Sequence, residues 1–465
     1  MTVTAIRRVR PVPRREPYTP PPMSRRRVVI TGLGPVTAHG VGIDPLWDAL
    51  CEGRSALAPI RAFNASGFIA ASGAELPDTF DVKDLVPKSY RKATKVMARD
   101  IEIAVGGALA AVRDAGLATR GTDPDSSPTI RPDRVGCHIG AGLIAAELDE
   151  LTGALASSRN ATGAFDPGQW GQQGMQELTP LWLLKYLPNM LACHVTIIHD
   201  CQGPSNTITC NEASSGLSLA ESQRVIERGA ADACLSGGAD SKMNPMAYLR
   251  QELAGRFARC APSDDATSIV KPFDAGASGT LIGEGGGILV VEAEETAKAR
   301  GARIHAVLAG TGASQSWCDD TVGLVPDSSG ESLADAMHAA LRDAGLTAAD
   351  IDAIIPFGSG VPSLDALERN ALERVFGADL AKKPLITLAP SIGTTCAGFG
   401  AIAVAVACRA LNEQKLPARL NTTSAAGLHA LAAPSTAQTL RHILIATPSL
   451  GGQNSAAVVS RHAEL

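Results

Sequence analysis

A thiol and a carboxylate lie two residues apart in the segment Thr209-Cys210-Asn211-Glu212-Ala213-Ser214-Ser215. A β-branched run precedes this segment and a helical pattern follows it, so the two groups fall at a predicted strand-to-helix junction. A helix N-terminus stabilises an anion, and a thiolate in such a position is a nucleophile. Cys210 and Glu212 are therefore the first candidates for chemistry.

Neither group has an obvious activating partner. No His or Lys lies near Cys210 in the sequence, so nothing there lowers its thiol pKa. Cys210 lies on the predicted strand itself. Period-2 alternation along that strand would put its side chain on the same face as that of Glu212. A carboxylate is a poor thioester acceptor, because the product would be a reactive mixed anhydride. We expect a structural role for Glu212 and keep nucleophilic use of Cys210 or Glu212 as alternatives. The more distant His138, His194 and His199 are expected to be structural.

Two other features, a glycine-rich run and the cysteines, could suggest phosphate or metal binding. Neither has the flanking residues or spacing that such a site requires. The run Gly283-Glu284-Gly285-Gly286-Gly287 does not open a helix after a first strand, and no Lys-Ser/Thr follows it, so phosphate binding is not expected. Close backbone approach is the better interpretation of these glycines. The ten cysteines include no CxxC pair and no zinc-type Cys/His cluster. The sequence therefore predicts no metal and no cofactor.

Short aliphatic or β-branched runs alternate with helical patterns along the body of the chain. The predicted strands are 28–34, 135–141, 206–211, 233–238 and 286–292 in one set, and 304–311, 353–358, 384–389, 442–447 and 455–460 in a second set. Helical periodicity covers 214–228, 331–344 and 397–412. The last of these is apolar on nearly all faces, which predicts a helix buried on every side.

The two strand sets resemble each other. Residues 28–34 are similar to residues 306–312, and residues 287–292 are similar to residues 455–460. This internal likeness predicts two similar halves, joined by a charged helix near 294–303.

Four blocks in order resemble the β-ketoacyl synthases, the thiolase-fold condensing enzymes of fatty-acid and polyketide synthesis. The blocks are Arg27–Gly34, Gly203–Gly229, Lys271–Asp274 with Gly283–Gly287, and Gly451–Asn454. The resemblance implies an α/β, thiolase-like fold of two similar five-stranded halves in a layered αβαβα arrangement. We expect an Arg/Pro-rich disordered tail at 1–26, an N-terminal ketosynthase half at 27–298 and a C-terminal half at 299–465. Met23 is an alternative translation start.

In that family a Cys at the elbow takes the acyl chain, and two His and a Lys support decarboxylative condensation. The motif register puts different residues at all of these positions. Glu212 replaces the Cys, Phe357 replaces the first His, and Thr394 (or Thr395, with a one-residue gap) replaces the second. Ala389 or Pro390 replaces the Lys, and Pro448 takes the place of the gating Phe of the closing loop. The substrate-tunnel candidates are Cys210, Glu212, Phe357, Thr394, Thr395, Pro448 and Leu450.

This pattern resembles the chain-length-factor branch, whose subunits replace the nucleophile, usually by Gln, and pair with an active ketosynthase. Ala277 stands where active enzymes commonly have an Arg. Glu instead of Gln departs from the branch. The resemblance implies a non-condensing subunit, a ketosynthase partner, and chains carried on the phosphopantetheine of an acyl carrier protein. It further implies that the strand at about 205–211 pairs across a dimer axis. The alternatives are a malonyl-carrier-protein decarboxylase or atypical synthase using Glu212 or Cys210, and a homodimeric acyl-binding scaffold.

The composition of the chain excludes several other classes of protein. The chain has 465 residues, 45% hydrophobic and 19% charged, with a net charge of −5, which excludes global disorder and gives no basic stripe for nucleic acid. No uninterrupted apolar run reaches the roughly 18 residues of a membrane span. The unpaired cysteines are typical of a reducing cytosol, so we expect a cytoplasmic protein.

Overall fold

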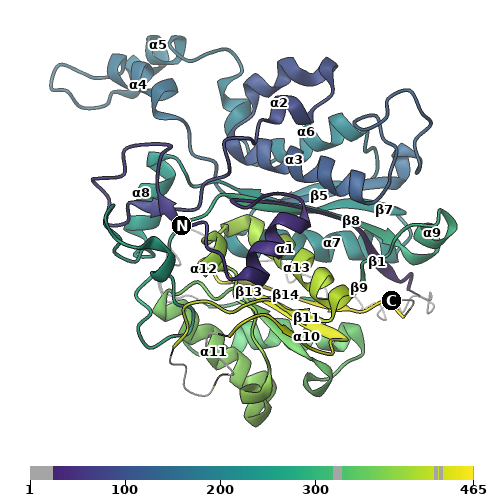
Figure 1. Ribbon diagram of the computed structural model, residues 1–465. Coiled ribbons are helices and arrows are strands. Elements are labelled where there is room, and N and C mark those ends of the chain that lie inside the picture. Colours follow the sequence, from purple (N-terminus) through teal and green to yellow (C-terminus); the bar gives the residue numbers. More distant parts are fainter. Residues whose placement is uncertain (1–24, 318–326, 424–427, 429–432, 464–465) are drawn as a thin grey trace, which may run out of the picture.

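The computed structural model describes residues 25–317, 327–423, 428 and 433–463, and Figure 1 shows its layers. The strands are β1 (Val28–Thr37), β2 (Gly40–Val41), β3 (Ala58–Pro59), β4 (Ser72–Gly73), β5 (Val135–Ala141), β6 (Ser205–Ile208), β7 (Ala233–Asp240), β8 (Gly285–Ala293), β9 (Ala306–Gln315), β10 (Ala353–Pro356), β11 (Lys415–Leu416), β12 (Thr436–Ala437), β13 (His442–Pro448) and β14 (Gln453–Ser460). The α-helices are α1 (Ile43–Glu52), α2 (Val82–Leu85), α3 (Arg99–Asp114), α4 (Leu148–Ser157), α5 (Pro167–Gln172), α6 (Met190–His199), α7 (Ser214–Glu227), α8 (Pro245–Leu253), α9 (Glu294–Ala299), α10 (Glu331–Ala344), α11 (Pro362–Phe376), α12 (Ala389–Ile392) and α13 (Phe399–Glu413).

The main sheet is mixed and runs in the order β10-β13-β14-β9-β1-β8-β7-β5-β6, with β2 paired to β1. β1 and β9 join its two halves through only two antiparallel residue pairs, Val29 with Val307 and Ile30 with Ala306. In Figure 1, α3 and α6 cover one side of the first half, α7 and α13 lie between the halves, and α10 and α11 cover the second half. The predicted layered, thiolase-like α/β fold is confirmed.

One predicted strand is wrong. Residues 384–389 form no strand, and only a single bridge links Leu385 to Ile354 of β10. Pro390 lies in the first turn of α12, where its missing N–H costs no helical bond, and Ala389 already belongs to that helix. The second half therefore contributes four strands to the main sheet, not the predicted five. In the first half the predicted strand 206–211 is shorter as well, because β6 ends at Ile208.

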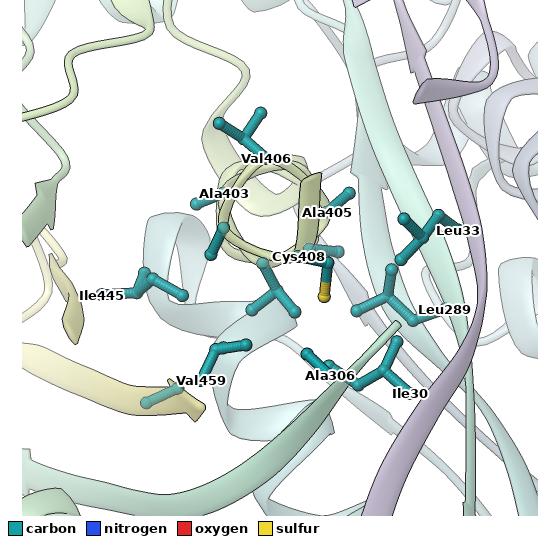
Figure 2. Close-up of a cluster of buried hydrophobic side chains, with 14 of the residues drawn as sticks. Ile30, Leu33, Leu289, Ala306, Ala403, Ala405, Val406, Cys408, Ile445 and Val459 are labelled. Atoms are coloured by element: carbon teal, nitrogen blue, oxygen red, sulfur yellow. The ribbon is translucent and has the colours of Figure 1, made fainter. Parts of the chain in front are cut away.

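The predicted all-sided burial of the helix at 397–412 is confirmed by α13. Figure 2 shows its Ala, Val and Cys side chains between strands of both halves, including Ile30 of β1 and Ile445 of β13. The helical stretch Cys396–Glu413 is long and apolar enough to cross a membrane, yet 83% of it is buried inside the molecule. That burial is expected of a core helix and fixes the two halves against each other.

Candidate functional site

Glu212 lies at the elbow between β6 and α7. It belongs to the single 3₁₀ turn Asn211–Ala213, and Asn211 adopts a left-handed conformation with φ of 46°. A positive φ at a non-glycine residue is a strained geometry that the surrounding structure must hold in place. The elbow therefore turns the chain sharply and directs it into α7, with Glu212 only 1% exposed.

A buried cation meets the Glu212 carboxylate. Nη1 of Arg256 lies 2.5 Å from Oε1 of Glu212, and the backbone N–H of Leu450 donates to Oε2 at 3.3 Å. The Arg256 side chain comes from the loop after α8 and is also buried. Burial alone would raise the pKa of the Glu212 carboxyl, but Arg256 and the hydrogen bonds outweigh it and leave the pKa below its ordinary value. Glu212 is therefore ionised, and Arg256 neutralises it.

Cys210 does not stand where the strand period put it. The strand ends two residues earlier, so the prediction that Cys210 lies on β6 and shares a face with Glu212 is wrong. Its N–H donates to Oγ of Ser214 at 2.8 Å, and its half-buried thiol has a pKa raised by burial. A thiol with a raised pKa is a poor nucleophile at neutral pH.

Phe357 follows β10 and is fully packed. Its N–H donates to Oε1 of Glu368 at 2.8 Å, and the N–H of Gly358 donates to Oε2 at 2.8 Å. Its ring meets that of Phe399 edge to face, with centroids 5.0 Å apart. The Glu368 side chain on α11 thus fixes the loop backbone at Phe357 and Gly358. The side chain at position 357 is an apolar ring.

Thr394 and Thr395 follow α12. The hydroxyl of Thr394 donates to the Leu281 carbonyl at 3.4 Å, and the buried hydroxyl of Thr395 has no hydrogen-bond partner among the described residues. The glycine run passes this segment closely: a Cβ on Gly283 would lie 1.8 Å from the Ile392 carbonyl oxygen. Close backbone approach, the interpretation favoured from the sequence, therefore accounts for Gly283.

The closing loop joins these parts. Pro448 ends β13 opposite Asn454 of β14, and Leu450 packs against Val361 and Leu364. The N–H of Leu450 is the group that meets Glu212. The loop therefore connects the elbow to the segment that follows Phe357.

The three histidines noted in the sequence have neighbours that do not belong to this site. His138 pairs with Ser222, His194 with Tyr90 and His199 with Thr119, and burial lowers the pKa of each imidazole to about 4. A fourth imidazole, His39, escaped the sequence analysis and lies 3.0 Å from the Ser391 hydroxyl on α12. Burial, and next Arg54, lower its pKa to about 4, so it is neutral.

The buried charges around the elbow were not predicted from the sequence. Arg256 is 44 residues from Glu212 in the chain, and nothing in the segment Gly255-Arg256-Phe257-Ala258-Arg259 distinguishes it from its neighbour Arg259. Nearby, Lys242 forms an ion pair with Asp240 and donates to the Leu143 carbonyl at 3.1 Å. Burial, and next the charge of Asp240, raise the pKa of Asp100 to about 8. A buried carboxylate is stable only when a cation or hydrogen-bond donors compensate its charge. The expected burial of Glu212 at the elbow was therefore the one sequence signal for a buried cation nearby.

Two cavities open near these elements. The first, of about 390 Å³, lies beside the loop that follows Phe357, and the second, of about 430 Å³, lies beside Arg99. The residues lining the first are Phe273, Asp274, Ala275, Ala277, Pro362, Asp365, Ala366, Arg369 and Asn370. Among the described residues no group of three or more His, Cys, Asp or Glu could hold a metal ion.

Known proteins agree with this architecture. The family of the β-ketoacyl synthase N-terminal domain matches residues 25–297, and that of the β-ketoacyl synthase C-terminal domain matches residues 305–423. The chain is 28% identical to 3-oxoacyl-[acyl-carrier-protein] synthase 2 of Vibrio harveyi, over 95% of this chain and 100% of the relative. It is 29% identical to the actinorhodin polyketide putative β-ketoacyl synthase 2 of Streptomyces coelicolor, over 94% and 99%.

A solved structure, the ishigamide ketosynthase/chain length factor, superposes with a TM-score of 0.78 at 26% identity, over 95% of this chain and 100% of that one. Both halves of the chain therefore match one family, in sequence and in three dimensions. The protein belongs to the β-ketoacyl synthase family and is a β-ketoacyl synthase-like protein of fatty-acid or polyketide biosynthesis.

Proposed function

We propose that this chain is a non-condensing subunit of the chain-length-factor type, which pairs with an active ketosynthase and acts on chains bound to an acyl carrier protein. One observation carries the proposal: a buried ion pair, Glu212 with Arg256, fills the elbow where the family's nucleophile belongs. A neutralised carboxylate without solvent access accepts no acyl group. Cys210, the nearest alternative, has a raised thiol pKa.

The rest of the site supports the same conclusion. Decarboxylation of a malonyl thioester needs donors on the developing enolate oxygen. Phe357 offers a hydrocarbon edge there, and Thr394 already donates its hydroxyl to a backbone carbonyl. His39 is neutral but engaged with Ser391. This site therefore lacks the nucleophile and the imidazole pair together.

The open edge of the sheet supports a dimeric assembly. Among the described residues β6 pairs only with β5, so its other side has no strand partner there. Beyond β5 the segment 142–187 exposes an unusual number of large apolar side chains. They are Leu143, Leu148, Leu155, Phe165, Met175, Leu181 and Leu183. Exposed apolar side chains and an unpaired strand edge are each typical of surfaces that a partner covers.

Co-expression with a ketosynthase from the same genome that retains its Cys and both His residues tests the proposal. We expect a one-to-one complex by native mass spectrometry, no condensation by this chain alone, and products whose length depends on its presence. A partner variant with its nucleophilic Cys changed to Ala is the control, and it should abolish all product.

Two outcomes would contradict the proposal. Turnover of malonyl carrier protein by the isolated chain, lost in Cys210→Ala or Glu212→Gln, would establish the enzyme alternative. A stable homodimer that ignores every ketosynthase offered would favour the acyl-binding scaffold.

A further inference from the structure

Arg256 forms the cationic wall of a small buried site. The residue is 7% exposed, its Nη1 meets Oε1 of Glu212, and its Nε has no hydrogen-bond partner among the described residues. From the opposite side the N–H of Leu450 points at Oε2 of the same carboxylate. A guanidinium and a backbone N–H converging on one carboxylate are the donors with which proteins bind free carboxylates.

The surroundings favour an anion over water beside Arg256. Asp240 lies close enough to raise the pKa of Arg256, but its own oxygens are engaged by Lys242 and by the N–H of Ala397. It therefore does not replace Glu212 as the close partner of Arg256. A buried guanidinium without a counter-charge is costly, so an anion that enters the site is strongly favoured over water.

We propose that Arg256 and the Leu450 N–H form a carboxylate-binding site that Glu212 occupies as an internal ligand. The site accepts a free short-chain monocarboxylate when the Glu212 side chain is shortened. The internal carboxylate excludes external ones from the native protein, including the free carboxylate of a dicarboxylic thioester. This inference does not depend on the proposed pairing with a ketosynthase.

The size of the expected ligand follows from the atoms removed. Glu212→Ala removes Cγ, Cδ and both oxygens, which are the four heavy atoms of acetate. Glu212→Gly also removes Cβ, and the missing atoms then match propionate. The Ala variant should therefore prefer acetate, and the Gly variant should gain relative affinity for propionate.

Thermal unfolding of the full-length Glu212→Ala variant tests the site at neutral pH and constant ionic strength. Added acetate should raise the midpoint by about 1–2 °C for each tenfold increase above its dissociation constant. Acetamide, which has the same shape without charge, and chloride should give no comparable shift. Wild-type protein is the matched control and should not respond, because Glu212 already fills the site.

A double variant isolates the role of the guanidinium. Glu212→Ala with Arg256→Met should unfold at a midpoint independent of acetate. If Glu212→Ala is not recovered in folded form, refolding yields with acetate against acetamide provide the same comparison, with acetate giving the higher yield. An acetamide effect equal to that of acetate, or an acetate effect that persists in the double variant, would overturn the assignment.

Discussion

The ion pair of Glu212 and Arg256 is stable only while both partners remain, because each charge is buried. We expect Arg256→Gln to destabilise the protein by about 3–5 kcal/mol near neutral pH, since it leaves a carboxylate in the interior without its cation. Urea unfolding measures the change. Arg259→Gln, at an exposed arginine three residues later, is the matched control and should be nearly neutral.

The same pair predicts a reversal in pH dependence. In the wild type the Glu212 pKa is lowered, so its contribution to stability is present above the unfolded-state pKa and is lost as the pH falls through the folded value. Without Arg256, burial raises that pKa. Lys242 is paired with Asp240, and the Leu450 N–H, Cys396 and Asp240 supply no positive charge to offset the burial. The Arg256→Gln variant should then lose stability as the pH rises above the unfolded-state pKa of a Glu carboxyl, about 4.3. Equal pH profiles for the variant and the wild type would contradict the assigned charges.

A thiol at position 212 would gain a cation but no catalytic imidazoles. Arg256 would lower the pKa of a thiol at position 212. Because that position is only 1% exposed, we still expect Glu212→Cys to react with iodoacetamide more slowly than the half-buried Cys210 does. Condensation should stay absent, since Phe357 replaces one donor on the malonyl carbonyl and Thr394 replaces the other. Alkylation rates against pH, in a Cys210→Ala background, and a malonyl elongation assay check both parts. Elongation by the single Glu212→Cys variant would show that the histidine positions are misplaced.

At the scale of elements, α13 packs against strands of both halves of the molecule. Ile402 is fully buried in the same hydrophobic cluster, so Ile402→Ala should cost about 2–5 kcal/mol through lost burial and a residual cavity. Leu155→Ala on α4, where the side chain is 42% exposed, serves as the control and should cost much less. Denaturant unfolding of both variants measures the difference, and equal costs would contradict the central role of α13.

Elements with a strong local pattern were predictable, and those decided by tertiary contacts were not. The apolar periodicity of α13 and the β-branched run of β1 identify both elements from sequence alone. Residues 384–389 have the composition of a strand, but α12 begins at Ala389 with Pro390 in its first turn. Only one β-bridge, between Leu385 and Ile354, remains of the predicted strand. The elbow at Glu212 was predictable from its motif register. Arg256 was not, because its pairing depends on how the loop after α8 folds over the elbow.

At the scale of the whole molecule, β6 is an edge strand of the described sheet, and its unpaired side is where the proposed partner would extend the sheet. Cys137 of β5 donates its N–H to the Pro204 carbonyl, and the parallel register then directs the N–H of Asn206 toward β5. Alternation along the strand turns the N–H of Thr207 to the open side. That N–H meets only the side chain of its neighbour, Oδ1 of Asn206, at 2.8 Å.

Thr207→Pro should therefore weaken assembly without breaking the β5–β6 pairing. The ring removes an outward N–H, a change that edge strands tolerate in a single chain, but it blocks antiparallel pairing with a partner strand. We expect at least a tenfold loss of affinity between this chain and the proposed ketosynthase partner, measured by native mass spectrometry or analytical ultracentrifugation. Thr207→Val keeps the N–H and the β-branched shape and should assemble normally. A Thr207→Pro protein that assembles as tightly as the Val variant would place the dimer contact elsewhere, and the exposed apolar segment 142–187 would then be the surface to test.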